Sequence, residues 1–189
     1  MDSRVRLLRA VDEVLAEVGP AALSLRAVAR RAGVSHNLPG VLFGDKRGLL
    51  TAYAAEGLRE LGRAMAEAEA DACPGPDALA ATGRAYVRFA LASPERFALM
   101  FRQDQLRADD PDYLDACREG FAPLARVMRR AVGSDPAIGR DVGTAAWAMV
   151  HGLAMLQIGG HLPARTGGVE PEALTARITA LFAQRMAGS

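Results

Sequence analysis

Apolar residues recur at helical spacing along nearly the whole chain, and no segment alternates between apolar and polar side chains as a half-buried strand does. Gly19-Pro20 and Gly33 end the first two apolar stripes, and Ser24 and Asp45 are suited to cap the helices that follow them. The pattern therefore predicts an all-α fold. The expected helices cover about residues 3–18, 25–32, 46–71, 76–92, 94–101, 111–132 and 136–158, with a last helix from about residue 171.

The basic residues exclude a common class of nucleotide-binding enzyme. Lys46 is the only lysine, and it is followed by Arg47 rather than by Ser or Thr, so no Walker-type phosphate loop is present. There is also no G-x-G-x-x-G, no H-E-x-x-H and no E-x-x-H before any of the three histidines. His151, His161 and Cys117 are too scattered for a metal site. We therefore expect no enzymatic activity, no cofactor and no metal.

The two cysteines and the longest uncharged segment help to predict the cellular compartment of the protein. Cys73 and Cys117 are too few for a secreted disulfide framework, and no flanking pattern suggests a redox switch. The segment from Val142 to Ala164 carries no formal charge and could span a bilayer. Its polar residues and four glycines favour instead a helix buried on all sides, in a core or a subunit interface. We expect a cytoplasmic protein with no membrane partner.

The N-terminal residues predict a helix-turn-helix. Ala29 is small where two helices would cross, Gly33 permits the positive φ of a sharp turn, and Val34 is the apolar residue of that turn. Residues 1–50 carry eight basic and five acidic side chains, which suits an end that faces DNA. We expect a helix-turn-helix DNA-binding domain over residues 1–48 and a helical ligand-binding and dimerisation domain over residues 49–189.

The stretch from Leu23 to Ser35, together with Phe43-x-Asp-Lys46-x-x-Leu49-Leu50, resembles the TetR family of bacterial transcriptional regulators. Residues 93–101 and Trp147-Ala-Met-Val-His151-Gly152 resemble the Trp-His-Gly (WHG) type of ligand-binding domain. The resemblance implies a homodimer whose two recognition helices bind a near-palindromic double-stranded DNA operator. The resemblance implies, position by position, that phosphates are bound by Ser24, Arg26 and Lys46. It also implies DNA contacts at the start of the recognition helix, by Ser35, His36 and Asn37.

The end of the recognition helix departs from the family pattern. The family usually has Tyr, one further residue, His and Phe here, whereas this chain has Gly40, Val41, Leu42 and Phe43. Gly40 cannot make the phosphate contact that the family tyrosine often makes. Pro39 is tolerated only near the start of a helix, so we expect a recognition helix that begins late or is kinked. Few side chains then remain for direct base readout.

Aromatic and methionine residues of the C-terminal part are candidates for an apolar ligand pocket. Ordinary core packing explains the same residues equally well, and Trp147 and His151 fit a packed tryptophan with a hydrogen-bonded histidine. Arg30 and Arg31 likewise fit either a solvated helix face or DNA contacts. The candidate pocket residues are Phe89, Phe97, Met100, Phe101, Met128, Trp147, His151 and Met155.

The sequence favours a regulator, expected to be a repressor, that a small apolar effector releases from DNA. The alternative is an all-α carrier of hydrophobic ligands with impaired DNA binding, which the Pro39-Gly40 sequence suggests; a membrane-inserted sensor is a third possibility. The uncharged helix and the last helix are the expected dimer interface. Four small residues would permit close approach there: Gly143, Ala146, Gly152 and Ala154.

Overall fold

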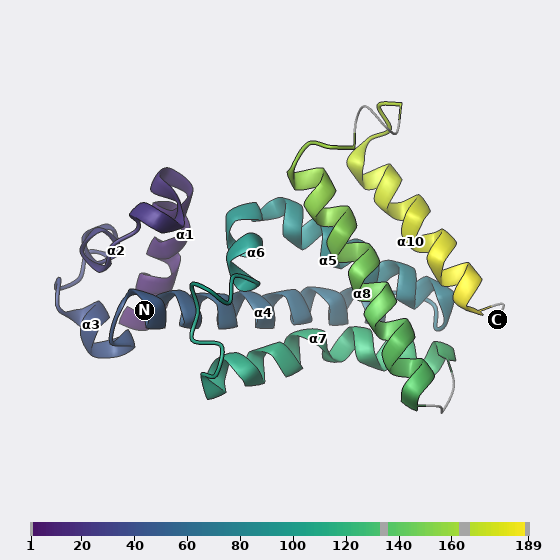
Figure 1. Cartoon of the computed structure of the whole chain (residues 1–189), viewed down its shortest axis with the longest axis horizontal. Coiled ribbons are helices and arrows are strands. Elements are labelled where there is room, and N and C mark those ends of the chain that lie inside the picture. Colours follow the sequence, from purple (N-terminus) through teal and green to yellow (C-terminus); the bar gives the residue numbers. More distant parts are fainter. Residues whose placement is uncertain (1, 133–135, 163–166, 188–189) are drawn as a thin grey trace. The chain divides into compact units, whose positions relative to one another are not determined.

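The computed structural model describes residues 2–132, 136–162 and 167–187, and every regular element among them is a helix (Figure 1). The predicted all-α fold is therefore confirmed. The helices are α1 (Ser3–Ala22), α2 (Leu25–Ala32), α3 (Leu38–Phe43), α4 (Lys46–Ala70), α5 (Pro76–Ala92), α6 (Pro94–Met100), α7 (Pro111–Val132), α8 (Pro136–Ile158) and α10 (Pro171–Ala187).

Most helix ends lie where the local signals place them. Ser24 caps α2, since its hydroxyl oxygen accepts a hydrogen bond from the Ala27 amide at 3.2 Å. Asp45 accepts one from the Gly48 amide at 2.8 Å at the start of α4. The first helix differs from the prediction, because α1 continues to Ala22 across a kink at Gly19, where φ is 69°.

The chain divides into two compact units, and α4 and α7 each contribute to both. The first unit combines Met1–Arg59 with Glu95–Arg118, and the second combines Glu60–Pro94 with Glu119–Ser189. The first unit thus holds α1, α2 and α3 together with α6. A DNA-binding domain that ends at residue 48 remains a prediction.

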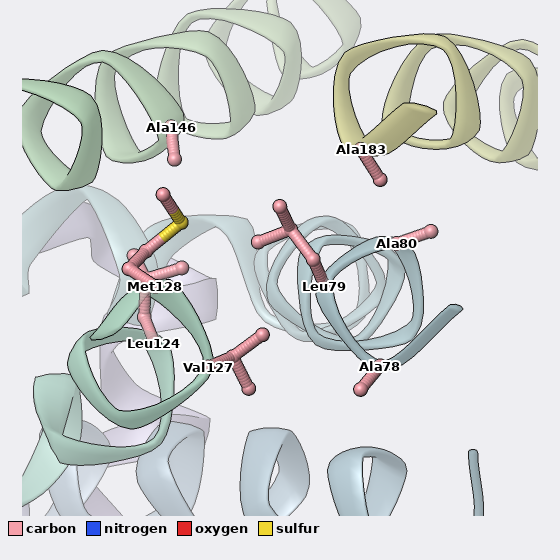
Figure 2. Packing of buried hydrophobic residues seen from close by; sticks show 8 residues of the cluster. All are labelled: Ala78, Leu79, Ala80, Leu124, Val127, Met128, Ala146 and Ala183. Atoms are coloured by element: carbon pink, nitrogen blue, oxygen red, sulfur yellow. The ribbon is translucent and has the colours of Figure 1, made fainter. Parts of the chain in front are cut away.

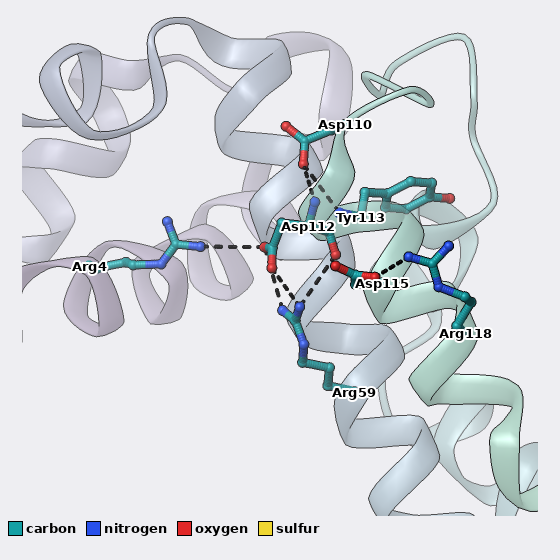
Figure 3. Close-up of polar contacts among 7 residues, drawn as sticks. All are labelled: Arg4, Arg59, Asp110, Asp112, Tyr113, Asp115 and Arg118. Atoms are coloured by element: carbon teal, nitrogen blue, oxygen red, sulfur yellow. Dashed lines mark hydrogen bonds and ion pairs between the residues drawn. The ribbon is translucent and has the colours of Figure 1, made fainter.

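Charged side chains fasten the start of α7 within the first unit (Figure 3). The Asp110 carboxylate caps α7 by accepting hydrogen bonds from the amides of Asp112 and Tyr113 at 3.0 and 3.2 Å. Asp112 in turn lies 2.5 Å from the Arg59 guanidinium of α4. Hydrogen bonding to Arg59 lowers the pKa of the Asp112 carboxyl, so it is ionised at neutral pH.

Small side chains bring the helices of the second unit together. Leu79 of α5 lies at the centre of a buried cluster to which α7, α8 and α10 also contribute (Figure 2). Ala146 of α8 and Ala183 of α10 face this cluster and are almost fully buried. Gly83 serves the same end, because a Cβ there would lie 2.9 Å from the Thr179 side chain of α10. The residues of the cluster are Ala78, Leu79, Ala80, Leu124, Val127, Met128, Ala146 and Ala183.

The exposure of α8 and α10 shows which of their apolar residues one chain leaves uncovered. The uncharged helix is not buried on all sides within one chain, since Met155 and Leu156 of α8 are 42% and 44% exposed. Helical spacing predicts Leu181 on the inner face of the last helix, yet it is 55% exposed. Helical spacing assigned these residues to an apolar face, and it does not distinguish the core of one chain from a surface that another molecule covers.

Candidate functional site

The α2–α3 segment forms the predicted helix-turn-helix. Gly33 follows α2 with a left-handed backbone (φ 63°, ψ 41°), and the Val34 amide donates to the Ala29 carbonyl at 3.1 Å. Arg6 of α1 reinforces the turn, because its guanidinium donates to the carbonyls of Ala32 and Gly33 at 2.5 and 3.0 Å. These bonds satisfy carbonyls that the end of α2 leaves open and fix the turn to α1.

The recognition helix begins late, as the Pro39-Gly40 sequence predicted. It starts at Leu38, after Asn37, which has helical dihedrals and makes no side-chain cap. Ser35 is of a residue type suited to capping the recognition helix, but it does not cap it. Its hydroxyl oxygen accepts a 3.4 Å hydrogen bond from the Asn37 amide, before the helix begins. Proline at the second helical position forces this arrangement, because it supplies no amide for a cap. Ser35, His36 and Asn37 therefore lie in an exposed turn that leads into α3.

The six residues of α3, Leu38–Phe43, carry no polar side chain. Pro39 and Phe43 are one turn apart and form the buried face of the helix. Val41 is 77% exposed and Leu42 is 41% exposed. A Cβ at Gly40 would meet no atom within 4 Å, so the helix surface is open at that point. Hydrogen-bond donors for base edges are therefore confined to the residues that precede α3.

Three arginines of α2 differ in their availability. Arg31 is bound to α1, with its guanidinium 2.9 Å from Glu13 and 2.6 Å from Glu17. Arg26 and Arg30 are exposed, and within the described parts of the chain neither has a carboxylate at ion-pair distance. Arg26 and Arg30 are four residues apart and share one face of the helix. Arg26 was predicted as a DNA contact, and Arg30, for which the sequence left a solvated face or a DNA contact open, lies exposed on the same face.

The start of α4 is held from two sides. The Lys46 ammonium donates to the Ala21 carbonyl at 2.9 Å, which uses one of its three donors. Asp45 forms a 3.0 Å ion pair with Arg107, in the segment between α6 and α7. The hydrogen bond from the Gly48 amide lowers the pKa of the Asp45 carboxyl most, and the hydrogen bond from Arg107 lowers it further.

The candidate pocket residues are divided between the two units. Phe97, Met100 and Phe101 belong to the first unit, where the rings of Phe97 and Phe101 make an edge contact with centroids 5.2 Å apart. The other five belong to the second unit: Phe89, Met128, Trp147, His151 and Met155. Met128 is part of the Leu79 cluster, whereas Met155 is exposed.

Trp147 and His151 of α8 meet at Tyr86 of α5, which the sequence did not single out as a site residue. The indole N–H of Trp147 donates to the Tyr86 hydroxyl at 3.1 Å, and that hydroxyl lies 2.9 Å from Nδ1 of His151. Indole is a donor only, so the hydroxyl accepts from Trp147, and the tautomer of His151 decides which group donates in the contact between Tyr86 and His151. Burial lowers the pKa of His151 and raises that of Tyr86, which keeps both groups uncharged.

The described residues of the second unit line a groove and a small cavity. The larger is an open groove of about 600 Å³ between α5 and the start of α10. Arg84, Val87 and Arg88 line its α5 side, and none of the candidate pocket residues borders it. The smaller, beside Leu79 and Phe182, measures about 10 Å³ and holds at most one water molecule.

Within the described residues, no three His, Cys, Asp or Glu side chains are grouped so as to hold a metal ion. No described helix combines the length and the apolar character that crossing a membrane requires.

Comparisons with known proteins agree with this geometry. Residues 7–53 match the sequence profile described as "Bacterial regulatory proteins, tetR family", and residues 79–182 match "Tetracyclin repressor-like, C-terminal domain". The WHG subgroup remains a prediction. A curated relative, the HTH-type transcriptional regulator BetI of Stenotrophomonas maltophilia (strain R551-3), is 40% identical over 73 residues. That match spans 39% of this chain and 37% of the length of BetI.

Solved structures extend the likeness to almost the whole chain. A protein of unknown function from Rhodococcus sp. RHA1 is 30% identical, with a TM-score of 0.83 over 99% of this chain and 96% of its own. A TetR family transcription regulator from Marinobacter aquaeolei VT8 is 18% identical, with a TM-score of 0.70 over 95% of this chain and 94% of its own, which shows the shared fold. The second profile alone covers more than half of the sequence. The chain therefore belongs to the TetR family, whose members are bacterial transcription regulators rather than enzymes.

Proposed function

We propose that this regulator is a homodimeric repressor that binds a near-palindromic operator and is released from it by a small apolar effector. The observation that carries the proposal is the surface around the α2–α3 turn. Exposed Ser35, His36 and Asn37 lie there beside two exposed arginines, Arg26 and Arg30, that have no described ion-pair partner. Such a surface offers donors for base edges and cations for phosphates.

Each predicted DNA contact keeps a group suited to its role. Asn37 can bind adenine through two hydrogen bonds, and His36 can donate to a base or a phosphate. The Ser24 oxygen accepts the Ala27 amide and retains its hydroxyl proton for a phosphate oxygen. Lys46 keeps two ammonium donors beside the one bound to Ala21. Arg26 completes the phosphate contacts.

The proposed dimer interface combines α8 and α10. Beyond Asp141, exposed residues of α8 recur at helical spacing and form an uncharged stripe that includes Ala148, Met155 and Leu156. Gly143 and Gly152 are open to the surface, since a Cβ at either would meet nothing within 4 Å. Ala146 and Ala154, expected to serve the same contact, are buried within their own subunit instead. Leu181 of α10 adds an exposed apolar side chain to this interface.

The effector would act through the distance between the two recognition helices. Helix-turn-helix dimers bind with these helices about 34–36 Å apart, one turn of DNA. Suppose that the effector binds more tightly, by several kcal/mol, to a dimer whose recognition helices are spaced differently. The dimer then dissociates from the operator when the effector binds. The eight aromatic, histidine and methionine residues named above remain predicted ligand contacts, three of them in the first unit and five in the second.

Fluorescence anisotropy with DNA from upstream of the gene tests the proposal. We expect nanomolar binding at about 150 mM salt that survives excess random competitor, because non-specific binding weakens steeply with salt. Changing Arg26 and Arg30 to Gln should weaken binding to every sequence and reduce the salt slope by about one for each phosphate that is no longer neutralised. Arg129→Gln is the matched control, because Arg129 is an exposed arginine near the end of α7.

The proposed repressor function would be contradicted if the protein bound apolar molecules but preferred no DNA sequence. It would favour the carrier of hydrophobic ligands instead.

A further inference from the structure

The recognition helix has an unusual chemical character for a DNA-reading element. Every side chain of α3 is apolar or absent, so the helix itself offers no hydrogen bond to a base edge. Val41 is nevertheless the most exposed of the large hydrophobic residues described, at 77%, and Leu42 beside it is 41% exposed. A single exposed apolar side chain is ordinary on a protein surface. Two adjacent ones on the helix that follows the turn are placed where DNA would be read.

The buried face of α3 shows that this exposure is not a packing failure. Phe43 is 6% exposed, and the Arg4 guanidinium lies over its ring at 5.3 Å from the centroid. Pro39 is buried on the same face. The helix is therefore docked on the first unit through Pro39 and Phe43, and it presents Val41 and Leu42 outward.

We propose that Val41 and Leu42 read thymine 5-methyl groups in the major groove of the operator. Thymine is the base whose major-groove edge carries a methyl group, and apolar side chains recognise it by contact. The segments next to α3 favour DNA as the partner of this exposed face. They carry the polar residues Ser35, His36 and Asn37 and the cations Arg26 and Arg30. Gly40, with open space above it, lets the helix surface approach the bases without a bulky side chain between them. This inference rests on the proposed operator binding and adds a base preference to it.

The test uses DNA that the full-length protein selects from a random pool. Selected duplexes are then synthesised with deoxyuridine in place of each thymidine in turn, which removes the methyl group and leaves the base pairing intact. We expect affinity to fall roughly fourfold for each contacted methyl group, the value of one buried methyl or methylene. Positions outside the recognition-helix footprint should show no change.

Variants of the protein assign the effect to side chains. Val41→Ala should weaken binding to duplexes that contain thymine. On a duplex that lacks the recognised methyl group, the same substitution should not lower the affinity further, because Val41 has no methyl group to contact there. Leu42→Ala should behave in the same way at a different position. Val18→Ala is the matched control: Val18 is 48% exposed at the end of α1, and its truncation should leave both duplexes unaffected.

The outcomes separate this inference from the proposed function. A fall in affinity with deoxyuridine that Val41→Ala or Leu42→Ala cancels supports it. Specific, salt-resistant binding that no deoxyuridine changes overturns the methyl readout and leaves operator binding intact. Failure to select any sequence at about 150 mM salt, where non-specific binding is weak, overturns both.

Discussion

The Tyr86 hydroxyl of α5 lies 2.9 Å from Nδ1 of His151 on α8 and accepts the indole N–H of Trp147 from the same helix. One buried hydroxyl thus joins two residues that the sequence offered as ligand contacts. The hydrogen bond to His151 agrees with the simpler interpretation, a packed tryptophan with a hydrogen-bonded histidine, but Trp147 is 36% exposed and is therefore packed only in part. The contact links α5 to α8. Because Trp147 is the only tryptophan, its fluorescence reports on this contact directly.

Tyr86→Phe should lower the free energy of unfolding by about 1–3 kcal/mol, because it leaves the Trp147 N–H and Nδ1 of His151 without this partner. Urea unfolding followed by Trp147 emission measures the change. Tyr113→Phe is the control; its hydroxyl donates to the Met100 carbonyl in the first unit, so it should leave native Trp147 emission unchanged. An unaltered emission spectrum in Tyr86→Phe would contradict the hydrogen bond.

His151 makes stability depend on pH in a defined direction. Burial lowers its pKa in the folded protein, so the unfolded chain binds this proton more readily. The free energy of unfolding should therefore decrease as the pH falls below about 6.5, the ordinary histidine value, and be unaffected by this group above it.

His151→Gln should remove that part of the pH profile between about pH 7 and 5, above the range in which carboxylates titrate. Asp45 and Asp112 do not interfere in this range, because hydrogen bonds lower their pKa values further. Equilibrium unfolding at a series of pH values provides the test. Identical profiles for the variant and the unmodified protein would show that His151 does not titrate as described.

Gly62 sets the distance between α4 and α7 in the second unit. A Cβ there would lie 2.9 Å from the Gly120 Cα and 3.0 Å from the Glu119 carbonyl oxygen, and neither backbone atom can move aside cheaply. Gly62→Ala should cost about 1–2 kcal/mol despite the better helix propensity of alanine. Gly40→Ala has open space around it and should instead stabilise the protein by about 0.5–1 kcal/mol. If both variants proved more stable on thermal unfolding, the close approach of α4 and α7 would be wrong.

Leu181→Asp tests the proposed dimer. Leu181 is 55% exposed in one chain, so the substitution should hardly affect the fold of a subunit. Buried unpaired in a subunit interface, the carboxylate should cost about 3 kcal/mol and raise the dimer dissociation constant by roughly a hundredfold. Sedimentation equilibrium of this variant and of Leu114→Asp, at a 43% exposed leucine of α7, gives the comparison. A monomeric unmodified protein, or equal dissociation in both variants, would refute this interface.

Local sequence signals predicted the helices well, because caps and breakers act within a few residues. Ser24, Gly33 and Asp45 mark their helix ends in the structure as they do in the sequence. The late start of α3 followed from Pro39 for the same reason. Motif residues also sufficed to place the chain in its family.

Long-range packing could not be predicted in the same way. Helical spacing marked Phe97 and Met128 alike as apolar, but it gave no sign that they belong to different units. It also marked Leu181 as buried, since an interface residue and a core residue have the same pattern. The sequence shows Tyr86 as an aromatic residue of a predicted helix. Its hydrogen-bond partners, Trp147 and His151 of α8, are 61 and 65 positions away in the sequence.

The proposed function requires that two α2–α3 segments of a homodimer read one near-palindromic operator together. Hydroxyl-radical footprinting of the purified protein on its selected DNA shows whether they do, at about 150 mM salt to suppress non-specific binding. We predict two protected segments related by two-fold symmetry, with centres about one helical turn, 10–10.5 base pairs, or a multiple of it apart. A single protected segment, or uniform protection without sequence preference, would refute the proposed mode of binding.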